Sequence, residues 1–132
     1  MNSYTMTVTI DTDAADAERR VREALQEQGF GVLSEIDVQA TLQDKLGEDI
    51  GTYKILGACN PGLARQAIAS DPDVGALLPC NVLLRANPDG GIDVAAADPA
   101  AMLALGPSGL SAVADDARAG IQAALGTLTD RS

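Results

Sequence analysis

The sequence predicts a two-layer α+β domain in which a curved, mostly antiparallel five-stranded sheet carries two long helices on one face. Five short segments alternate apolar and polar residues, which is typical of strands with one buried face. Two longer segments, residues 13–28 and 108–125, place their apolar residues at helical spacing along a single stripe. The expected order is therefore β-α-β-β-β-β-α, with short helical pieces in the connections.

Residues 4–10 form the first predicted strand, in which apolar side chains alternate with threonines. Alternation of this kind indicates a half-buried strand. Asp11, Thr12 and Asp13 follow it and supply N-cap side chains and favourable charge for the first long helix. Gly29 ends that helix, because glycine is a common C-terminal stop.

The middle of the chain supplies the second and third strands. Residues 30–38 alternate, with an interruption at Ser34, and are the second strand. Thr41 then begins a short helix that Gly47 breaks, and residues 52–59 form the third strand. The two faces of the third strand are Tyr53, Ile55, Gly57 and Cys59 on one side and Lys54, Leu56 and Ala58 on the other.

Asn60 and Pro61 predict a helix start directly after the third strand. Asparagine is a strong N-cap, and the missing N–H of proline costs nothing at the first helical position. Asp71 and Pro72 end this helix, because the residue before a proline avoids helical geometry. The apolar side of the helix consists of Leu63, Ala64, Ala67 and Ile68.

The last third of the chain predicts a hairpin followed by two helices. Residues 78–97 contain the fourth and fifth strands around a glycine-rich turn. Asp98 and Pro99 cap a short helix, and Ser108 caps the second long helix. Residues 127–132 are expected to be a frayed C-terminal tail.

The composition fits a single domain that spans residues 1–132. The chain has 132 residues, of which 46% are hydrophobic, and a chain of this length buries a core of its own. No run approaches the ~20 apolar residues of a membrane span, and the N-terminus lacks the features of a secretory signal. Two cysteines are too few for a disulfide framework, so we expect a cytoplasmic protein with reduced thiols.

Charge and residue types exclude several classes of function. The formal net charge is −10 and the nine basic residues are scattered, so nucleic acids and anionic membranes are poor partners for this acidic chain. The absence of histidine excludes Ser-His-Asp and Cys-His nucleophile pairs and histidine metal ligation. With three aromatic residues in the whole chain, base-stacking platforms are excluded too.

Several short motifs carry a resemblance to a known family. They are KLG at residues 45–47, YKILGACNP at 53–61, DPDVG running into LPCNV at 71–82, and DP at 98–99. In this order they resemble the bacterial family called domain of unknown function 302, over nearly the whole chain. The resemblance implies a TATA-binding-protein-like α+β fold and a homodimer. Many members carry a histidine in the helix after the second strand, and this chain has none, so no role of that residue is transferred.

Cys59 and Cys80 are the two cysteines, and each precedes an asparagine. Antiparallel pairing of the third and fourth strands would make the two thiols neighbours at one end of the sheet. Cys59 is expected to be the more reactive thiol, because the positive end of a helix begins directly after it. The candidate thiol or ligand site consists of Cys59, Asn60, Pro61, Cys80 and Asn81.

This candidate site has functional and structural interpretations. Two thiols suit redox chemistry or a soft metal such as Cu(I) or Zn(II), but free cysteines are also common as small core residues. A four-ligand zinc site would need two chains, because two cysteines supply half of the ligands. Asn60 and Pro61 are a simple helix cap or, alternatively, the start of an anion site. No catalytic residue and no required cofactor is assigned.

Three functions fit these residues, and the first is favoured. It is a non-catalytic intracellular homodimer that binds a small ligand or a soft metal through the Cys59/Cys80 region. The second is a cysteine-dependent redox enzyme, which would have to use a carboxylate, lysine or tyrosine as its base. The third is a structural or interaction subunit in which the cysteines only pack.

The homodimer is expected to use the face of the sheet without helices. The alternation assigns Leu33, Leu56, Ala58 and Leu83 to that face. Exposed apolar patches often mark interfaces, so this patch and the family resemblance predict the same assembly.

Overall fold

The computed structural model describes residues 2–130, and its elements follow the predicted order. The strands are β1 (Thr5–Ile10), β2 (Gly31–Asp37), β3 (Tyr53–Cys59), β4 (Cys80–Ala86) and β5 (Ile92–Ala97). The α-helices are α1 (Ala14–Glu27), α2 (Val38–Leu46), α3 (Pro61–Ser70), α4 (Pro99–Leu103) and α5 (Ser111–Asp130). Two 3₁₀ helices, η1 (Pro72–Leu77) and η2 (Ser108–Leu110), lie in the connections.

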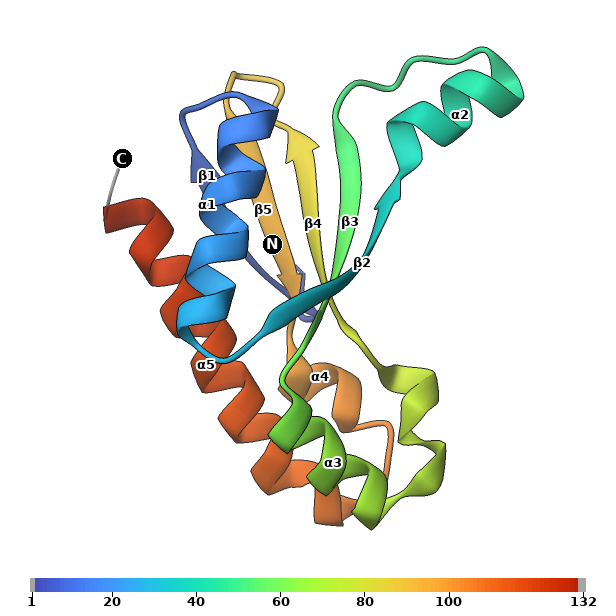
Figure 1. Ribbon diagram of the computed structural model, residues 1–132, viewed down its shortest axis with the longest axis vertical. Helices are drawn as coiled ribbons and strands as arrows, with labels where there is room; N and C mark the ends of the chain where they lie inside the picture. The colour runs from blue at the N-terminus through green and yellow to red at the C-terminus, as the bar shows by residue number, and fades with distance from the viewer. Residues whose placement is uncertain (1, 131–132) are drawn as a thin grey trace.

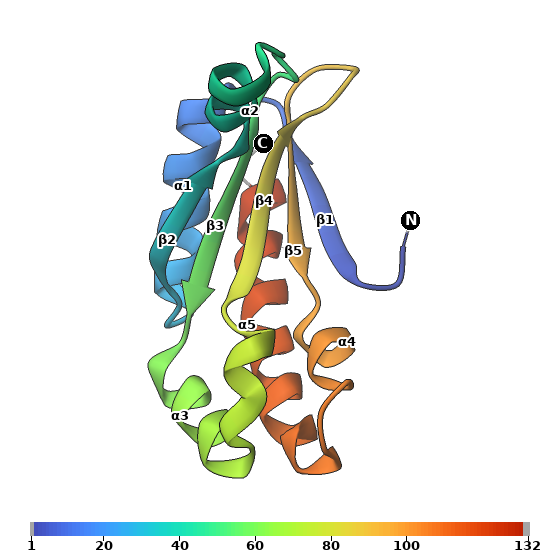
Figure 2. The same cartoon turned by 90° about the vertical axis from the view of Figure 1, so that its right-hand side faces the viewer.

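The five strands form one open sheet in the order β1-β5-β4-β3-β2, and every neighbouring pair is antiparallel. Figure 1 and Figure 2 show that α1 and α5 lie side by side on one face of this sheet. The predicted α+β class, the antiparallel sheet and the two helices on one face are confirmed. Within residues 2–130, the structure contains no helix with the length and apolar character needed to cross a bilayer.

A core of aliphatic side chains, the sheet core, fills the space between the sheet and its two helices. Its members are at most 2% exposed at positions such as Val21, Leu25, Leu56, Leu84 and Ile121. Full burial of a side chain of this size stabilises the fold by about 1.5–3 kcal/mol. The sheet core therefore holds β3 and β4 firmly, and the two cysteines are carried on the ends of these strands.

Beyond the cysteine end of the sheet lies the helical end, made of α3, η1, α4, η2 and the first turns of α5 (Figure 2). A second, smaller hydrophobic cluster holds it together, made of Ala67, Val74, Leu103, Leu110, Val113 and Ala114. Helix α5 joins the two regions, because its later residues Ile121 and Leu125 belong to the sheet core. The sequence did not predict this second cluster as a separate unit.

Phe30 lies where the two regions meet, and a glycine in α5 makes room for its ring. A Cβ atom at Gly120 would lie 2.8 Å from Phe30 Cε1, which is closer than real Cβ contacts. Any larger residue at this position would push the ring away from α5. Phe30 is 2% exposed, so the ring is a fixed part of the junction.

The face assigned to Leu56 and Ala58 from the sequence is wrong. Both side chains are 0% exposed in the sheet core, because Leu56 pairs with Val82 on the face that the helices cover. The alternation within β3 holds, but it does not reveal which face is covered. Leu33 is 75% exposed at an irregularity of β2, and Leu83 is partly buried on the open face.

Helix α2 projects from the sheet as an arm (Figure 1). It begins at Val38 rather than at the predicted Thr41, because Asp37 accepts a hydrogen bond from the Ala40 N–H (2.9 Å) and caps the helix there. None of its residues is buried, and Leu46 is 65% exposed. The arm therefore carries apolar side chains that nothing within residues 2–130 covers.

Helix α5 differs from its prediction at both ends. It begins at Ser111, because Ser108 is not its cap but the first residue of η2. It continues to Asp130, and Leu128 is 2% exposed in the sheet core. The frayed tail expected at residues 127–132 is thus helical up to Asp130, and residues 131–132 lie outside the described part of the chain.

Candidate functional site

Cys59 is the last residue of β3, and Asn60 caps α3 immediately after it. Asn60 Oδ1 accepts a hydrogen bond from the Leu63 N–H (3.2 Å), and Pro61 takes the first helical position, which confirms the predicted helix start. A Cβ atom on Gly29 would lie 3.1 Å from Asn60 Nδ2. The Asn60 amide is therefore held between the helix start and the turn after α1.

Cys80 is the first residue of β4 and pairs with Ala58 in β3. Consecutive Cα atoms are about 3.8 Å apart and paired antiparallel Cα atoms about 5 Å, so the Cα atoms of Cys59 and Cys80 are roughly 6 Å apart. The two residues lie at the same end of neighbouring strands, as expected from the sequence. Both are free thiols, and both are partly buried.

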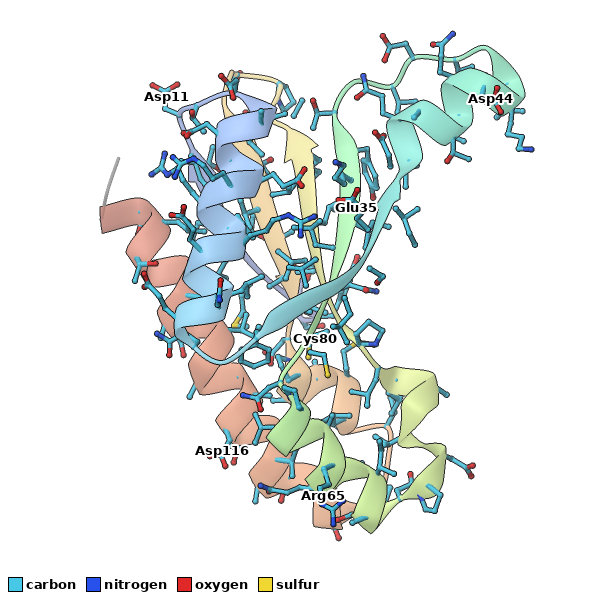
Figure 3. All side chains as sticks on the ribbon, in the orientation of Figure 1. Asp11, Glu35, Asp44, Arg65, Cys80 and Asp116 are labelled. Atoms are coloured by element: carbon cyan, nitrogen blue, oxygen red, sulfur yellow. The ribbon has the colours of Figure 1, made fainter. Side chains whose placement is uncertain are left out.

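A cavity of about 410 Å³ lies where the sheet meets the helical end. Figure 3 shows Cys80 at this junction, close to α3 and α4. The cavity has mostly apolar walls, which include Phe30, Ala58, Leu63, Ala67, Leu103 and Val113. Its volume lies in the range of small-molecule pockets, roughly 300–1,000 Å³. We call it the thiol cavity, because Cys59 and Cys80 both line it.

The polar side chains that line the thiol cavity are uncharged: Ser34, Cys59, Asn60 and Cys80. Burial raises the pKa of the Cys80 thiol, and the nearby Cys59 raises it further. Cys80 is therefore a neutral thiol at neutral pH. A charged ligand would lose its hydration here without gaining a partner of opposite charge among the lining residues, so the site favours neutral molecules.

One rim of the thiol cavity depends on Gly57. A Cβ atom at this position would lie 2.3 Å from Ser34 Oγ and 2.9 Å from Pro79 Cγ. Ser34 and Pro79 both line the cavity, and they meet across the strand because β3 has no side chain at Gly57. The glycine therefore allows β2 and the start of β4 to close around the end of β3.

The thiol cavity has few side chains that could bind a metal ion. The described residues contain no group of three or more histidine, cysteine, aspartate or glutamate side chains placed to hold a metal ion. Two thiolates fit a two-coordinate soft ion such as Cu(I), but burial disfavours the thiolate of Cys80. The donor set of one chain thus fits a neutral ligand better than a metal.

Two residues of the predicted site lie outside the thiol cavity. Pro61 is exposed at the start of α3. Asn81 is also exposed, and it lines a separate cavity of about 120 Å³ beside Cys80. Asn81 pairs with Gly57, so alternation directs its side chain to the face opposite to that of Cys80. The structure brings together the other three predicted residues.

Sequence reasoning missed Phe30, Ser34, Leu103 and Val113 as parts of the site. Ser34 did leave a signal, since it interrupts the apolar alternation of the second strand. The other three look like ordinary core positions: Phe30 precedes β2, Leu103 lies in α4 and Val113 lies in α5. They meet only through the packing of α5 against the end of the sheet.

Comparison with known proteins gives one family. Residues 6–128 match the family described as "Domain of unknown function DUF302". The structure is similar to the crystal structure of an uncharacterized conserved protein DUF302 from Bacillus stearothermophilus, with a TM-score of 0.88 and 27% sequence identity. The similarity covers 96% of this chain and 99% of that chain. No curated protein matches the chain significantly. Because the family match spans most of the sequence and the fold agrees, this chain belongs to the DUF302 family.

Proposed function

We propose that this protein is a non-catalytic binding protein for a neutral, apolar small molecule, which it holds in the thiol cavity. The observation that carries the proposal is a cavity of about 410 Å³ with apolar walls and no charged side chain among its described lining residues. Transfer of apolar ligand surface from water into such walls is favourable by about 25 cal/mol per Å².

The mouth of the thiol cavity supports the same ligand class. Leu33 and Ile68 both line the cavity and are 75% and 50% exposed. A bound apolar molecule would cover part of these side chains as well as the inner walls. Binding would therefore remove exposed apolar surface from the protein as well as from the ligand.

A neutral fluorescent dye tests the proposal. N-phenylnaphthylamine should bind with enhanced fluorescence, and Ala64→Leu should weaken binding at least about tenfold, because the new side chain fills the cavity. Ala69→Leu is the matched control, since Ala69 lies on the exposed side of α3 and does not line the cavity. Absence of dye binding, or equal binding by both variants, would refute the proposal.

We also propose that the protein acts as a homodimer through the edge strand β2 and the arm α2. Leu33, Ile36 and Leu46 are 75%, 54% and 65% exposed in this region, and exposed apolar residues that gather on one surface often mark interfaces. Sedimentation at micromolar concentration should give a dimer that Ile36→Glu converts to a monomer. Leu105→Glu, at a 76% exposed position of the helical end, should leave the dimer intact. A monomeric wild-type protein would rule the dimer out.

The two free thiols support a cytoplasmic location, because reducing compartments keep thiols unpaired.

The two free thiols also support a second candidate function, a redox thiol pair. The separation of about 6 Å between the Cα atoms of Cys59 and Cys80 is within the range of disulfides. Mild peroxide would then convert both thiols to one intramolecular disulfide, with a loss of two hydrogens by intact mass. Two thiols that persist under this treatment would exclude the redox pair and leave the binding function.

A further inference from the structure

We propose that Cys59 covalently captures neutral, apolar α,β-unsaturated carbonyl compounds bound in the thiol cavity. This inference rests on the proposed function, because the compound must first occupy the cavity. It goes further by naming the reacting atom, the ligand class and the bond that forms.

The cavity offers thiols as its soft nucleophiles and excludes the usual competitors. No lysine is among the described residues that line it, and the chain has no histidine. Soft thiols add preferentially to the β-carbon of a conjugated carbonyl, whereas amines also condense with the carbonyl carbon. An enone held in this cavity therefore meets a thiol as its reaction partner.

The two thiols are not equivalent in this role. Burial raises the pKa of Cys80, so the fraction of thiolate at that residue is small at neutral pH. Cys59 ends β3 at the rim, next to the start of α3, where backbone N–H groups point outward from the helix. Cys59 is therefore the nucleophile, and Cys80 is part of the wall.

Two lining residues, Asn60 and Ser34, have hydrogen-bond donors that are free to bind the carbonyl oxygen of the ligand. Asn60 Oδ1 is occupied by the Leu63 N–H, but within residues 2–130 the Asn60 Nδ2 group donates no hydrogen bond. The Ser34 hydroxyl likewise has no hydrogen-bond partner in the described chain. Both side chains line the cavity. The oxygen of a conjugated carbonyl gains negative charge as the thiol adds, so these donors stabilise it most at that point.

The addition needs no oxidant, reductant or cofactor. Cys59 Sγ loses its proton to water and forms a bond with the β-carbon of the ligand. The carbon–carbon π pair moves toward the carbonyl to give an enolate, and the α-carbon then takes a proton from water. The product is a thioether, and the net change is addition of S–H across the double bond.

The apolar walls decide which conjugated carbonyl reacts. A ligand with an alkyl tail is concentrated beside Cys59 by its contacts with Leu63, Ala64 and Ile68, and holding two reactants together raises the rate of their reaction. A short enone has the same reacting group without this anchor. Tail length should therefore change the rate with this protein much more than with a small thiol in solution.

The test compares pentyl vinyl ketone with methyl vinyl ketone, using the full-length protein and glutathione as separate thiols. The protein should favour the pentyl compound over the methyl compound about tenfold more than glutathione does, because of the buried methylenes. Peptide mass spectrometry should place one adduct on Cys59. Cys59→Ser should abolish this adduct, whereas Ala69→Leu, outside the cavity, should retain it with the same preference. Ala64→Leu should reduce the preference to that of glutathione.

The outcomes separate this inference from the proposed function. If the neutral dye binds but the protein shows the same tail preference as glutathione, covalent capture is wrong and the binding function stands. An adduct on Cys80 instead of Cys59 would also refute covalent capture by Cys59. If the dye does not bind, the proposed binding function and the covalent capture by Cys59 are both refuted. If a cysteine variant fails to fold, the rates of the wild-type protein and glutathione with the two ketones still test covalent capture.

Discussion

The sheet core and the helical end share helix α5, yet they are filled to different extents. In the sheet core, Ile10, Leu56 and Val94 are 0% exposed and belong to one continuous cluster. At the boundary of the helical end, Leu63 and Leu103 line a cavity of about 410 Å³ instead. An unfilled cavity costs stability through lost contacts. The chain therefore packs closely in one region and leaves space in the next.

Polar groups show the same contrast. On the open face of the sheet, Asp93 is 4% exposed, and its oxygens accept hydrogen bonds from Thr9 (2.6 Å), Asn87 (2.8 Å) and Arg85. In the thiol cavity, the Asn60 amide keeps donors that the described chain does not use. The hydrogen bonds of the Asp93 cluster are complete within the protein, whereas the Asn60 amide keeps free donors at the cavity.

The largest effect should come from deleting a side chain in the sheet core. Leu56→Ala should lower the free energy of unfolding by about 4 kcal/mol, because the surrounding core cannot collapse into the space. Leu103→Ala removes the same atoms from a cavity wall and should cost about 2 kcal/mol, at the lower end of such changes. Urea denaturation measures both. Equal losses would mean that the two regions are packed alike.

Gly57→Ala should cost about 2 kcal/mol, because the new Cβ would contact Ser34 Oγ and Pro79 Cγ too closely. Ser34→Ala should by itself have little effect on stability. The double variant should recover about 1 kcal/mol of the loss, since the closest of the two contacts is gone. A strictly additive double variant would show that the contact with Ser34 does not cause the strain.

Asp93→Asn should lower stability by about 1–2 kcal/mol at neutral pH. Burial alone raises the pKa of Asp93, but hydrogen bonds from Asn87 and Thr9 and the charge of Arg85 outweigh it and hold the pKa below its usual value. A depressed pKa stabilises the fold above the unfolded-state value of about 3.9, and this contribution disappears as the pH falls further through the folded-state pKa.

Denaturation at several pH values checks the sign of this effect. The difference between wild type and Asp93→Asn should be constant near neutrality and shrink below about pH 4. Asp89→Asn, at an exposed position of the β4–β5 turn, should change stability by less than about 0.5 kcal/mol at any pH. A difference that grows on acidification would contradict the account of Asp93.

The smallest effect on stability should come from filling the thiol cavity. Ala64→Leu adds apolar contacts in open space and should change the free energy of unfolding by at most about 1 kcal/mol, in the stabilising direction. Ala69→Leu on the exposed side of the same helix should be neutral within about 0.5 kcal/mol. A strongly destabilising Ala64→Leu would mean that the side chain meets protein atoms instead of space.

Local patterns predicted most of the fold, and long-range packing explains what they missed. Alternation located the strands, and Asn60 with Pro61 located the start of α3. Alternation failed to identify the covered face of β3, because both faces carry apolar residues and the choice depends on pairing of Leu56 with Val82. It also ended α5 too early, since burial of Leu128 stabilises a last turn that contains weak helix formers.

The candidate site was predicted in part for a similar reason. Cys59, Asn60 and Cys80 lie next to turns of the chain, so a pairing of neighbouring strands was enough to bring them together. Asn81 was assigned by its proximity in sequence, and the period of two along β4 places it on the other face. The cavity itself has no sequence signal, because its walls come from elements that are distant along the chain.

The central claim is that the junction between the two regions binds a neutral apolar molecule. It is tested most directly by an NMR titration of the isotope-labelled protein with octanol. Saturable shifts should be confined to the end of β3, the first turns of α3 and the start of β4, including Cys59, Leu63 and Cys80, while β1 and the first half of α1 stay unchanged. No saturable shifts at this junction, or shifts spread evenly over the sheet core, would contradict the claim.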